Sequence, residues 1–418
     1  MLSKQRKKAQ PMAKQGQLSL FYKIFSNRYF ILAVWIFLAV FYTYKYIGYG
    51  SINNYLIFKY TYFNAAMGHN LYAAYPQFYS DTNHYGPIFC LIIAPFALLA
   101  GNLGLYFWQI CNVAFLFCAI QLLPLSTLKK NIICIICAQE LIISLKEFQT
   151  NGAIAALLIF TWVLVENKKD FWASLFIMLG LFVKLYGVVG VVFFLLSKQK
   201  KQFIAGLFFW GAVLFVLPML FFSPAFVAHS YIDWYHSLME KNAQNISMST
   251  QYQDISVTGM VRRIVGHQIN ILPILLTAVV LFAVSSLKKQ MAADLRSRLL
   301  MLASCLLFVV LFSTSSEHPT YIIAFVGVGI WFMSAPQPVN KWQIALFAFT
   351  LYFGSLFRTD IFPAYIKNNL IMPYALKALP CLMVWLTIVT EMLAKKPAAV
   401  QPEAAPLNDM ITPTPTTI

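Results

Sequence analysis

Residues 171–197 read FWASLFIMLGLFVKLYGVVGVVFFLLS, an apolar stretch whose only charged residue is Lys184. A helix of roughly 20 apolar residues crosses the hydrocarbon layer of a bilayer, which is about 30 Å thick. Similar runs recur along the chain, and we expect further helices near 29–47, 87–101, 103–124, 131–147, 151–166, 203–222, 271–287, 298–314, 319–335, 342–358 and 372–394. The sequence therefore predicts an all-α integral membrane protein with about 10–12 membrane helices.

The composition supports this interpretation. Of the 418 residues, 60% are hydrophobic and only 11% are charged, whereas soluble domains carry about 25% charged residues. The 31 Lys and Arg residues outnumber the 14 Asp and Glu residues and fall mostly in short clusters between apolar runs. Such clusters are typical of membrane orientation signals and of attraction to anionic headgroups. No segment outside the apolar runs is long enough to form a nucleic-acid-binding domain, so the expected partner is the lipid bilayer and not nucleic acid.

The basic clusters also predict an orientation. We expect residues 1–28 to be a basic cytoplasmic tail, 29–396 a polytopic membrane domain, and 397–418 a disordered cytoplasmic tail. Two polar stretches, 48–86 and 223–270, are expected as large outer loops. The resulting protein spans the inner (plasma) membrane several times, with both termini in the cytoplasm.

If all the basic clusters lie on the cytoplasmic side, the number of membrane crossings between them requires two adjustments to the predicted helices. The run at 87–101, which opens at Pro87, must be re-entrant or interfacial, and the run at 171–197 must be two half-length helices that meet near Lys184. An unpaired ammonium inside a membrane is costly, so we expect Lys184 to meet an anion. A structural alternative is that Lys184 pairs with a carboxylate such as Glu140 only to hold helices together.

Cofactor motifs are absent from the sequence. No Asp-X-Asp and no Gly-rich phosphate loop occurs, which disfavours a metal-clamped nucleotide sugar. All seven cysteines lie in apolar segments, and the zinc-like spacing of Cys134 and Cys137 lacks a second ligand pair. We therefore expect no metal and no cofactor.

Several motifs occur in an informative order. The first outer stretch contains INNYLIFK at 52–59, AAMGHNLY at 65–72 and DTNHYGPIF at 81–89. Later come QTNG at 149–152, FVKL at 182–185 and EHPTY at 317–321. This order, over roughly residues 30 to 335, resembles glycosyltransferase family 87, the polytopic mannosyltransferase-type enzymes also called DUF2029.

The resemblance implies a C-type glycosyltransferase fold, a helical bundle with re-entrant or half helices and two large outer loops. It also implies a polyprenyl-phosphate sugar as donor, commonly mannose, and transfer of the hexose to a glycolipid or glycan acceptor on the periplasmic or other extracytoplasmic side. In that family the first outer loop carries a catalytic Asp four residues before an aromatic residue. Here the matching position is Asn54, four residues before Phe58, and an amide cannot accept a proton from the acceptor hydroxyl.

Three interpretations of this departure remain open. Asp81 or Glu317 could be the base, the protein could bind the lipid without transferring sugar, or His84 or His318 could be the base. The candidate catalytic residues are thus Asp81, Glu317, His318 and Asn54. The candidate donor-phosphate and substrate-binding residues are Lys59, His84, Tyr85, Gln149, Asn151, Lys184, Arg262 and Arg263. For Arg262 and Arg263, binding of lipid headgroups is the alternative role.

The main rival function is a secondary transporter or lipid-linked-sugar flippase. Such a protein should have coupled carboxylates at mid-membrane depth and pseudo-symmetric halves. Glu140 is the only carboxylate in the middle of an apolar run, and no internal repeat is evident. A transferase should instead gather its polar residues at one face, so we expect Asp81, Lys184 and Glu317 to line one cavity.

Overall fold

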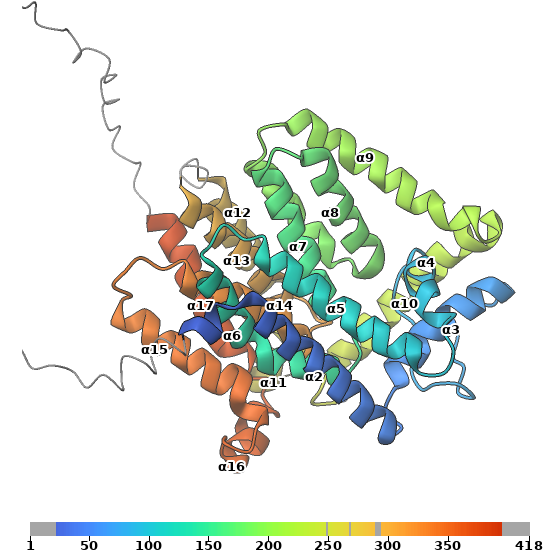
Figure 1. Ribbon diagram of the computed structural model, residues 1–418, viewed down its shortest axis with the longest axis horizontal. Coiled ribbons are helices and arrows are strands. Elements are labelled where there is room, and N and C mark those ends of the chain that lie inside the picture. The colour runs from blue at the N-terminus through green and yellow to red at the C-terminus, as the bar shows by residue number, and fades with distance from the viewer. Residues whose placement is uncertain (1–21, 248–249, 267–268, 289–293, 395–418) are drawn as a thin grey trace, which may run out of the picture.

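The computed structural model describes residues 22–247, 250–266, 269–288 and 294–394. Every regular element within these ranges is helical, so the predicted all-α class is confirmed (Figure 1). The predicted tail at 397–418 and most of the tail at 1–28 lie outside the described residues.

The helices follow the apolar runs closely. The N-terminal half contains α2 (Arg28–Gly48), α3 (Asn53–Met67), α4 (Phe89–Ala97), α5 (Leu103–Gln121), α6 (Thr127–Lys146), α7 (Asn151–Glu166), α8 (Asp170–Lys184) and the 3-10 helix η1 (Tyr186–Leu195). The C-terminal half contains α9 (Lys200–Val216), η2 (Leu217–Leu220), α10 (Pro224–Ser247), α11 (Val257–Val265), α12 (Leu272–Leu287), α13 (Leu295–Leu311), η4 (His318–Thr320), α14 (Tyr321–Met333), α15 (Lys341–Phe349), η5 (Thr350–Ser355), η6 (Leu356–Arg358), α16 (Ala364–Ile366), η7 (Lys367–Ile371) and α17 (Ala378–Ala394).

Three segments among the described residues are long and apolar enough to cross a membrane: α2, α5 and Lys200–Leu220, which α9 and η2 form together. Five further apolar helices are shorter, with 10–17 residues. Apolar helices of this kind fit a membrane protein, as the sequence predicts. The predicted total of about 10–12 spans stays a prediction.

The helix break predicted near Lys184 is confirmed. Helix α8 ends at Lys184, Leu185 adopts a left-handed conformation with φ of 58°, and η1 follows. The two halves fold back on each other at a point where only glycine fits, because a Cβ on Gly187 would lie 2.4 Å from the carbonyl oxygen of Ile177. The apolar run at 171–197 is therefore a tight hairpin of two short helices.

The short helix expected at 87–101 is also present. Helix α4 has 9 residues with Pro95 inside it, and a helix of that length rises only about 14 Å. Helix α4 is therefore too short to cross a membrane by itself, which agrees with the expectation that the run at 87–101 does not span the bilayer.

The two polar stretches contain regular structure. Residues 48–86 contain α3, and residues 223–270 contain α10 and α11, so both stretches are helical for much of their length, and their place on the outer side of the membrane stays a prediction. Helices α3 and α10 mix aromatic and polar residues, and a search for membrane-length apolar runs does not detect such helices. Helix α10 runs beside the segment 81–86 and helps to position it, as the site contacts below show.

A buried ion pair joins α6 to the residue just before α17. The ammonium of Lys377 lies 2.7 Å from a carboxylate oxygen of Glu140, and both side chains are fully buried. Helix α6, which carries Glu140, packs against α14 and the turn η4. The predicted alternative that Lys184 pairs with Glu140 is therefore wrong, because Lys377 already occupies that carboxylate.

Candidate active site

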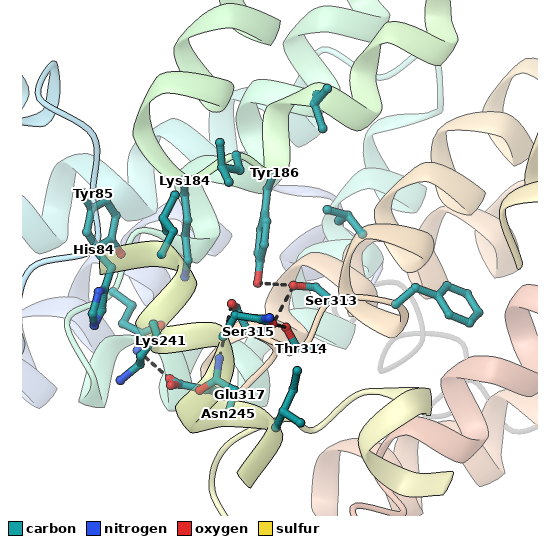
Figure 2. Close-up of a pocket in the computed structure, with 18 of the residues that line it drawn as sticks. His84, Tyr85, Lys184, Tyr186, Lys241, Asn245, Ser313, Thr314, Ser315 and Glu317 are labelled. Carbon is teal, nitrogen blue, oxygen red and sulfur yellow. Dashed lines mark hydrogen bonds between the residues drawn. The ribbon is translucent and has the colours of Figure 1, made fainter. Parts of the chain in front are cut away.

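A cavity of about 760 Å³ opens where seven parts of the chain meet. Its walls come from α3, the segment 81–85, the residues 147–149, the α8–η1 break, α10, the start of α12, and α13 with the residues that follow it. Figure 2 shows Tyr85, Lys184 and Tyr186 on one side of the space, with Lys241 and Glu317 across from them. Asp81, Lys184 and Glu317 all line this cavity, so the prediction that they converge is confirmed.

Four polar residues form a continuous hydrogen-bonded chain along the wall. The Lys184 ammonium donates to Asn151 Oδ1 at 2.9 Å, and Asn151 Nδ2 donates to Gln149 Oε1 at 2.7 Å. Gln149 Nε2 in turn donates to Glu317 Oε2 at 3.0 Å. The chain joins a cation at the end of α8 to a carboxylate at the start of η4, through the residues that begin α7. We call these four residues the Lys184–Glu317 network.

Lys184 has no carboxylate within ion-pairing distance among the described residues; its only hydrogen bond is to the amide of Asn151. Its ammonium lies 5.9 Å from the ring centroid of Tyr85 and 5.3 Å from that of Tyr186. Aromatic faces attract a cation but do not neutralise it. A positive charge therefore faces the cavity and is available to an anion there.

Asp81 contributes a second charged cluster. Lys241 Nζ lies 3.2 Å from Asp81 Oδ2, and His84 Nε2 lies 3.8 Å from Asp81 Oδ1. Burial alone would raise the pKa of Asp81, but the contacts with His84 and Lys241 outweigh burial and hold this pKa below its usual range. The backbone at Asp81 has a positive φ of 77°, a strained conformation for a residue with a side chain. Asp81 is thus held ionised beside a lysine.

The segment after Asp81 is anchored to two helices. Trp234 Nε1 donates to the carbonyl of His84 at 2.9 Å, and Ser237 Oγ lies 2.8 Å from His84 Nδ1. Gly86 lies so close to α8 that a Cβ there would be 2.0 Å from the carbonyl oxygen of Phe182. Tyr85 is consequently fixed in place, with its hydroxyl 3.0 Å from Thr150 Oγ1.

The other predicted site residues divide into two groups. Asn54, His84, Tyr85 and Gln149 line the cavity, and Asn151 lies directly behind it in the Lys184–Glu317 network. Lys59, His318, Arg262 and Arg263 are not among the lining residues.

The contacts of the arginines and of His318 explain their positions. Arg262 forms a buried ion pair with Asp254 at 3.1 Å, and Arg263 donates to the carbonyl of Gln253 at 2.6 Å. Burial raises the pKa of Asp254 although Ser256 and Arg262 act in the opposite direction. His318 is buried beside Phe357. The structure therefore does not bring these three side chains to the cavity.

Several lining residues were missed by the sequence analysis. They are Glu147, Lys241, Asn242, Asn245 and the run Ser313–Ser315. Thr314 Oγ1 donates to Asn242 Oδ1 at 2.7 Å, so the residues after α13 are tied to α10. A helix assignment for 224–247 would have placed Lys241, Asn242 and Asn245 on neighbouring turns, but that stretch was expected to be a loop.

The residues that the structure describes include no group of three His, Cys, Asp or Glu side chains able to hold a metal ion. A family model described as glycosyltransferase family 87 matches residues 83–314, which is more than half of the chain. The match includes His84, Gln149, Lys184 and Lys241. The search of curated proteins gave no match.

Proposed function

The chain belongs to glycosyltransferase family 87, and from this premise we propose that it transfers a hexose, mannose, from a polyprenyl phosphate to a glycolipid or glycan. Membership of the family makes the protein a glycosyltransferase. The donor, the acceptor and a reaction at the non-cytoplasmic face of the membrane are the proposed parts.

The observation that carries the proposal is the Lys184–Glu317 network in the wall of the cavity. A lipid phosphate departs as an anion, so a nearby cation stabilises it as the leaving group. Lys184 presents such a cation, an ammonium without a carboxylate partner. The same cavity has an apolar wall suited to an isoprenoid chain. This wall contains Ile271, Leu275, Phe308, Val309 and Phe312.

The chemistry we propose is a single displacement at the anomeric carbon. The acceptor oxygen forms a bond to that carbon while the bond from the carbon to the phosphate oxygen breaks, and the lipid phosphate leaves with the electron pair. A base must take the proton of the acceptor hydroxyl. Glu317 is the better candidate, because Asp81 is already paired with Lys241 and a carboxylate with a lowered pKa is a weaker base.

The test uses purified full-length protein in liposomes, radiolabelled polyprenyl-phosphate mannose and a membrane lipid extract as acceptor. We expect Glu317→Gln to lower the initial transfer rate about 10²–10³-fold, as the loss of a general base does, and Asp81→Asn to lower it less. Glu240→Gln, a change at an exposed carboxylate on α10 outside the cavity lining, is the control. Parental rates in both Asp81→Asn and Glu317→Gln would show that neither carboxylate is the base.

A further inference from the structure

A second cavity, of about 500 Å³, adjoins the first. Its lining residues come from the end of α2, the start of α3 and the residues at the end of α6: Tyr46, Gly50, Ser51, Asn53, Asn54, Lys146, Glu147 and Phe148. Asn54 and Glu147 line both cavities. The side chains of Asn54 and Glu147 therefore lie between the two cavities.

The junction between the cavities is well defined. Asn54 Nδ2 donates to the backbone carbonyl of Glu147 at 2.8 Å, which ties the start of α3 to the end of α6. Asn53 donates to the carbonyl of Ser80 at 2.6 Å and accepts from the Ser80 amide at 2.8 Å. Of these bonds only the one from Asn54 involves Glu147, and it uses the backbone carbonyl, so the Glu147 carboxylate remains available at the junction.

The charges around the second cavity are mainly positive. Lys146 lines it, has no carboxylate within ion-pairing distance among the described residues, and lies 5.3 Å from the ring centroid of Tyr42. Arg358 and Lys45 act on Lys146 as like charges, and Glu147 acts on it as the opposite charge.

We propose that the second cavity is the acceptor subsite and that it takes a sugar bearing a negatively charged group, such as a phosphate, which Lys146 binds. This inference rests on the proposed function. The acceptor hydroxyl then enters the first cavity beside Asn54 and Glu147, reaches the donor sugar and gives its proton to Glu317, while Asn54 and Glu147 act as positioning residues. Amide and carboxylate groups suit this task, because both accept hydrogen bonds from sugar hydroxyls.

The first test measures binding and needs no catalysis. Tritiated mannose 6-phosphate and tritiated mannose are titrated against the purified full chain in phospholipid-free detergent. We expect the phosphate to tighten binding about tenfold, the contribution of one charge-assisted hydrogen bond. Lys146→Gln should remove this advantage, Lys146→Arg should keep it, and Lys198→Gln, at an exposed lysine outside both cavities, should leave it intact. Equal affinity of the parent for both sugars would overturn the charge assignment.

A steric variant tests the location. Ser51→Trp fills the second cavity without touching the first, because Ser51 lines only the second. It should abolish binding of mannose 6-phosphate, whereas Ala74→Trp, at an exposed position outside both cavities, should not. Undiminished binding in a folded Ser51→Trp protein would place the probe elsewhere and refute the subsite.

The anionic group could also belong to a membrane lipid headgroup, so the titration is repeated in nanodiscs. Displacement of mannose 6-phosphate by phosphatidylglycerol, but not by phosphatidylcholine, would assign the cavity to a headgroup and overturn the proposal. Equal affinity in both nanodiscs supports an acceptor site.

The transfer assay then separates this inference from the proposed function. Lys146→Gln should raise the concentration of the acidic fraction of the lipid extract needed for half-maximal transfer, with an unchanged KM for the donor. If label appears only in neutral products, the charged acceptor is contradicted, whereas the proposed transfer from the lipid-linked donor still holds. If the parent transfers no label at all, the proposed donor fails while the binding result still decides the subsite.

Discussion

Two lysines at helix ends experience opposite surroundings in this protein. Lys377, just before α17, is fully buried and lies 2.7 Å from the carboxylate of Glu140. Lys184, at the end of α8, is half-buried, donates to an amide and faces an open cavity. The first lysine is neutralised within the protein, and the second is not.

The difference indicates which lysine supports the fold and which supports function. A buried ion pair in which each charge compensates the other contributes to holding helices in register, and removal of one partner leaves a costly isolated charge. A lysine whose ammonium contacts two aromatic rings and one amide keeps its charge and can still bind an anion. Mutations at the two sites should therefore separate stability from activity.

The largest effect is expected at the neutralised pair. Lys377→Met should destabilise the protein by about 3–5 kcal/mol, because Glu140 is left buried without its partner. The double variant Lys377→Met with Glu140→Leu should recover most of that loss, since no isolated charge remains. Thermal and urea unfolding in detergent, followed by tryptophan fluorescence, would measure both. A single variant as stable as the parent would mean that the pair does not hold the core.

At the second lysine the expected effect is on rate. Lys184→Met should lower sugar transfer about 10²–10³-fold, as loss of a group that stabilises developing charge does. The same variant should unfold within about 1 kcal/mol of the parent, because no carboxylate loses its partner. Lys184→Arg should recover part of the activity by keeping the charge. A large loss of stability in Lys184→Met would make Lys184 a structural residue like Lys377.

A smaller effect is expected within the network itself. Gln149→Leu removes the link between Asn151 and Glu317, so it should lower the transfer rate about tenfold by releasing the carboxylate from its orientation. Gln149→Glu should also lower the transfer rate. The new carboxylate cannot donate the hydrogen bond to Glu317, and its charge repels that of Glu317. If kcat is unchanged in both variants, the network does not position the base.

The sequence predicted the helices well and the site in part, for a physical reason. Apolar runs report apolar helices directly, three of them long enough to cross a membrane. The count of crossings between basic clusters required a break in 171–197 near Lys184, which the structure contains. Helix α10 was not predicted, because its mixed aromatic and polar face lacks an apolar run, and Lys241 was missed with it. The partner of Glu140 could not be chosen from sequence either, since Lys377 lies 237 positions away and only the packing of α6 against the residues before α17 brings them together.

The smallest effect concerns Asp81, which combines features of both lysine sites because it is ion-paired yet half-exposed. A carboxyl whose pKa is lowered in the folded state stabilises the protein above its unfolded pKa, and this contribution is lost as the pH falls through the folded pKa. Asp81→Asn should therefore be less stable than the parent at pH 7, by under about 1 kcal/mol because the pair with Lys241 is screened by solvent. The difference should shrink as the solution is acidified below the unfolded pKa, which unfolding curves at pH 7 and in acid would reveal. A difference that grows on acidification would mean that the carboxyl is protonated in the folded protein, and Asp81 would then become a possible proton donor in the cavity.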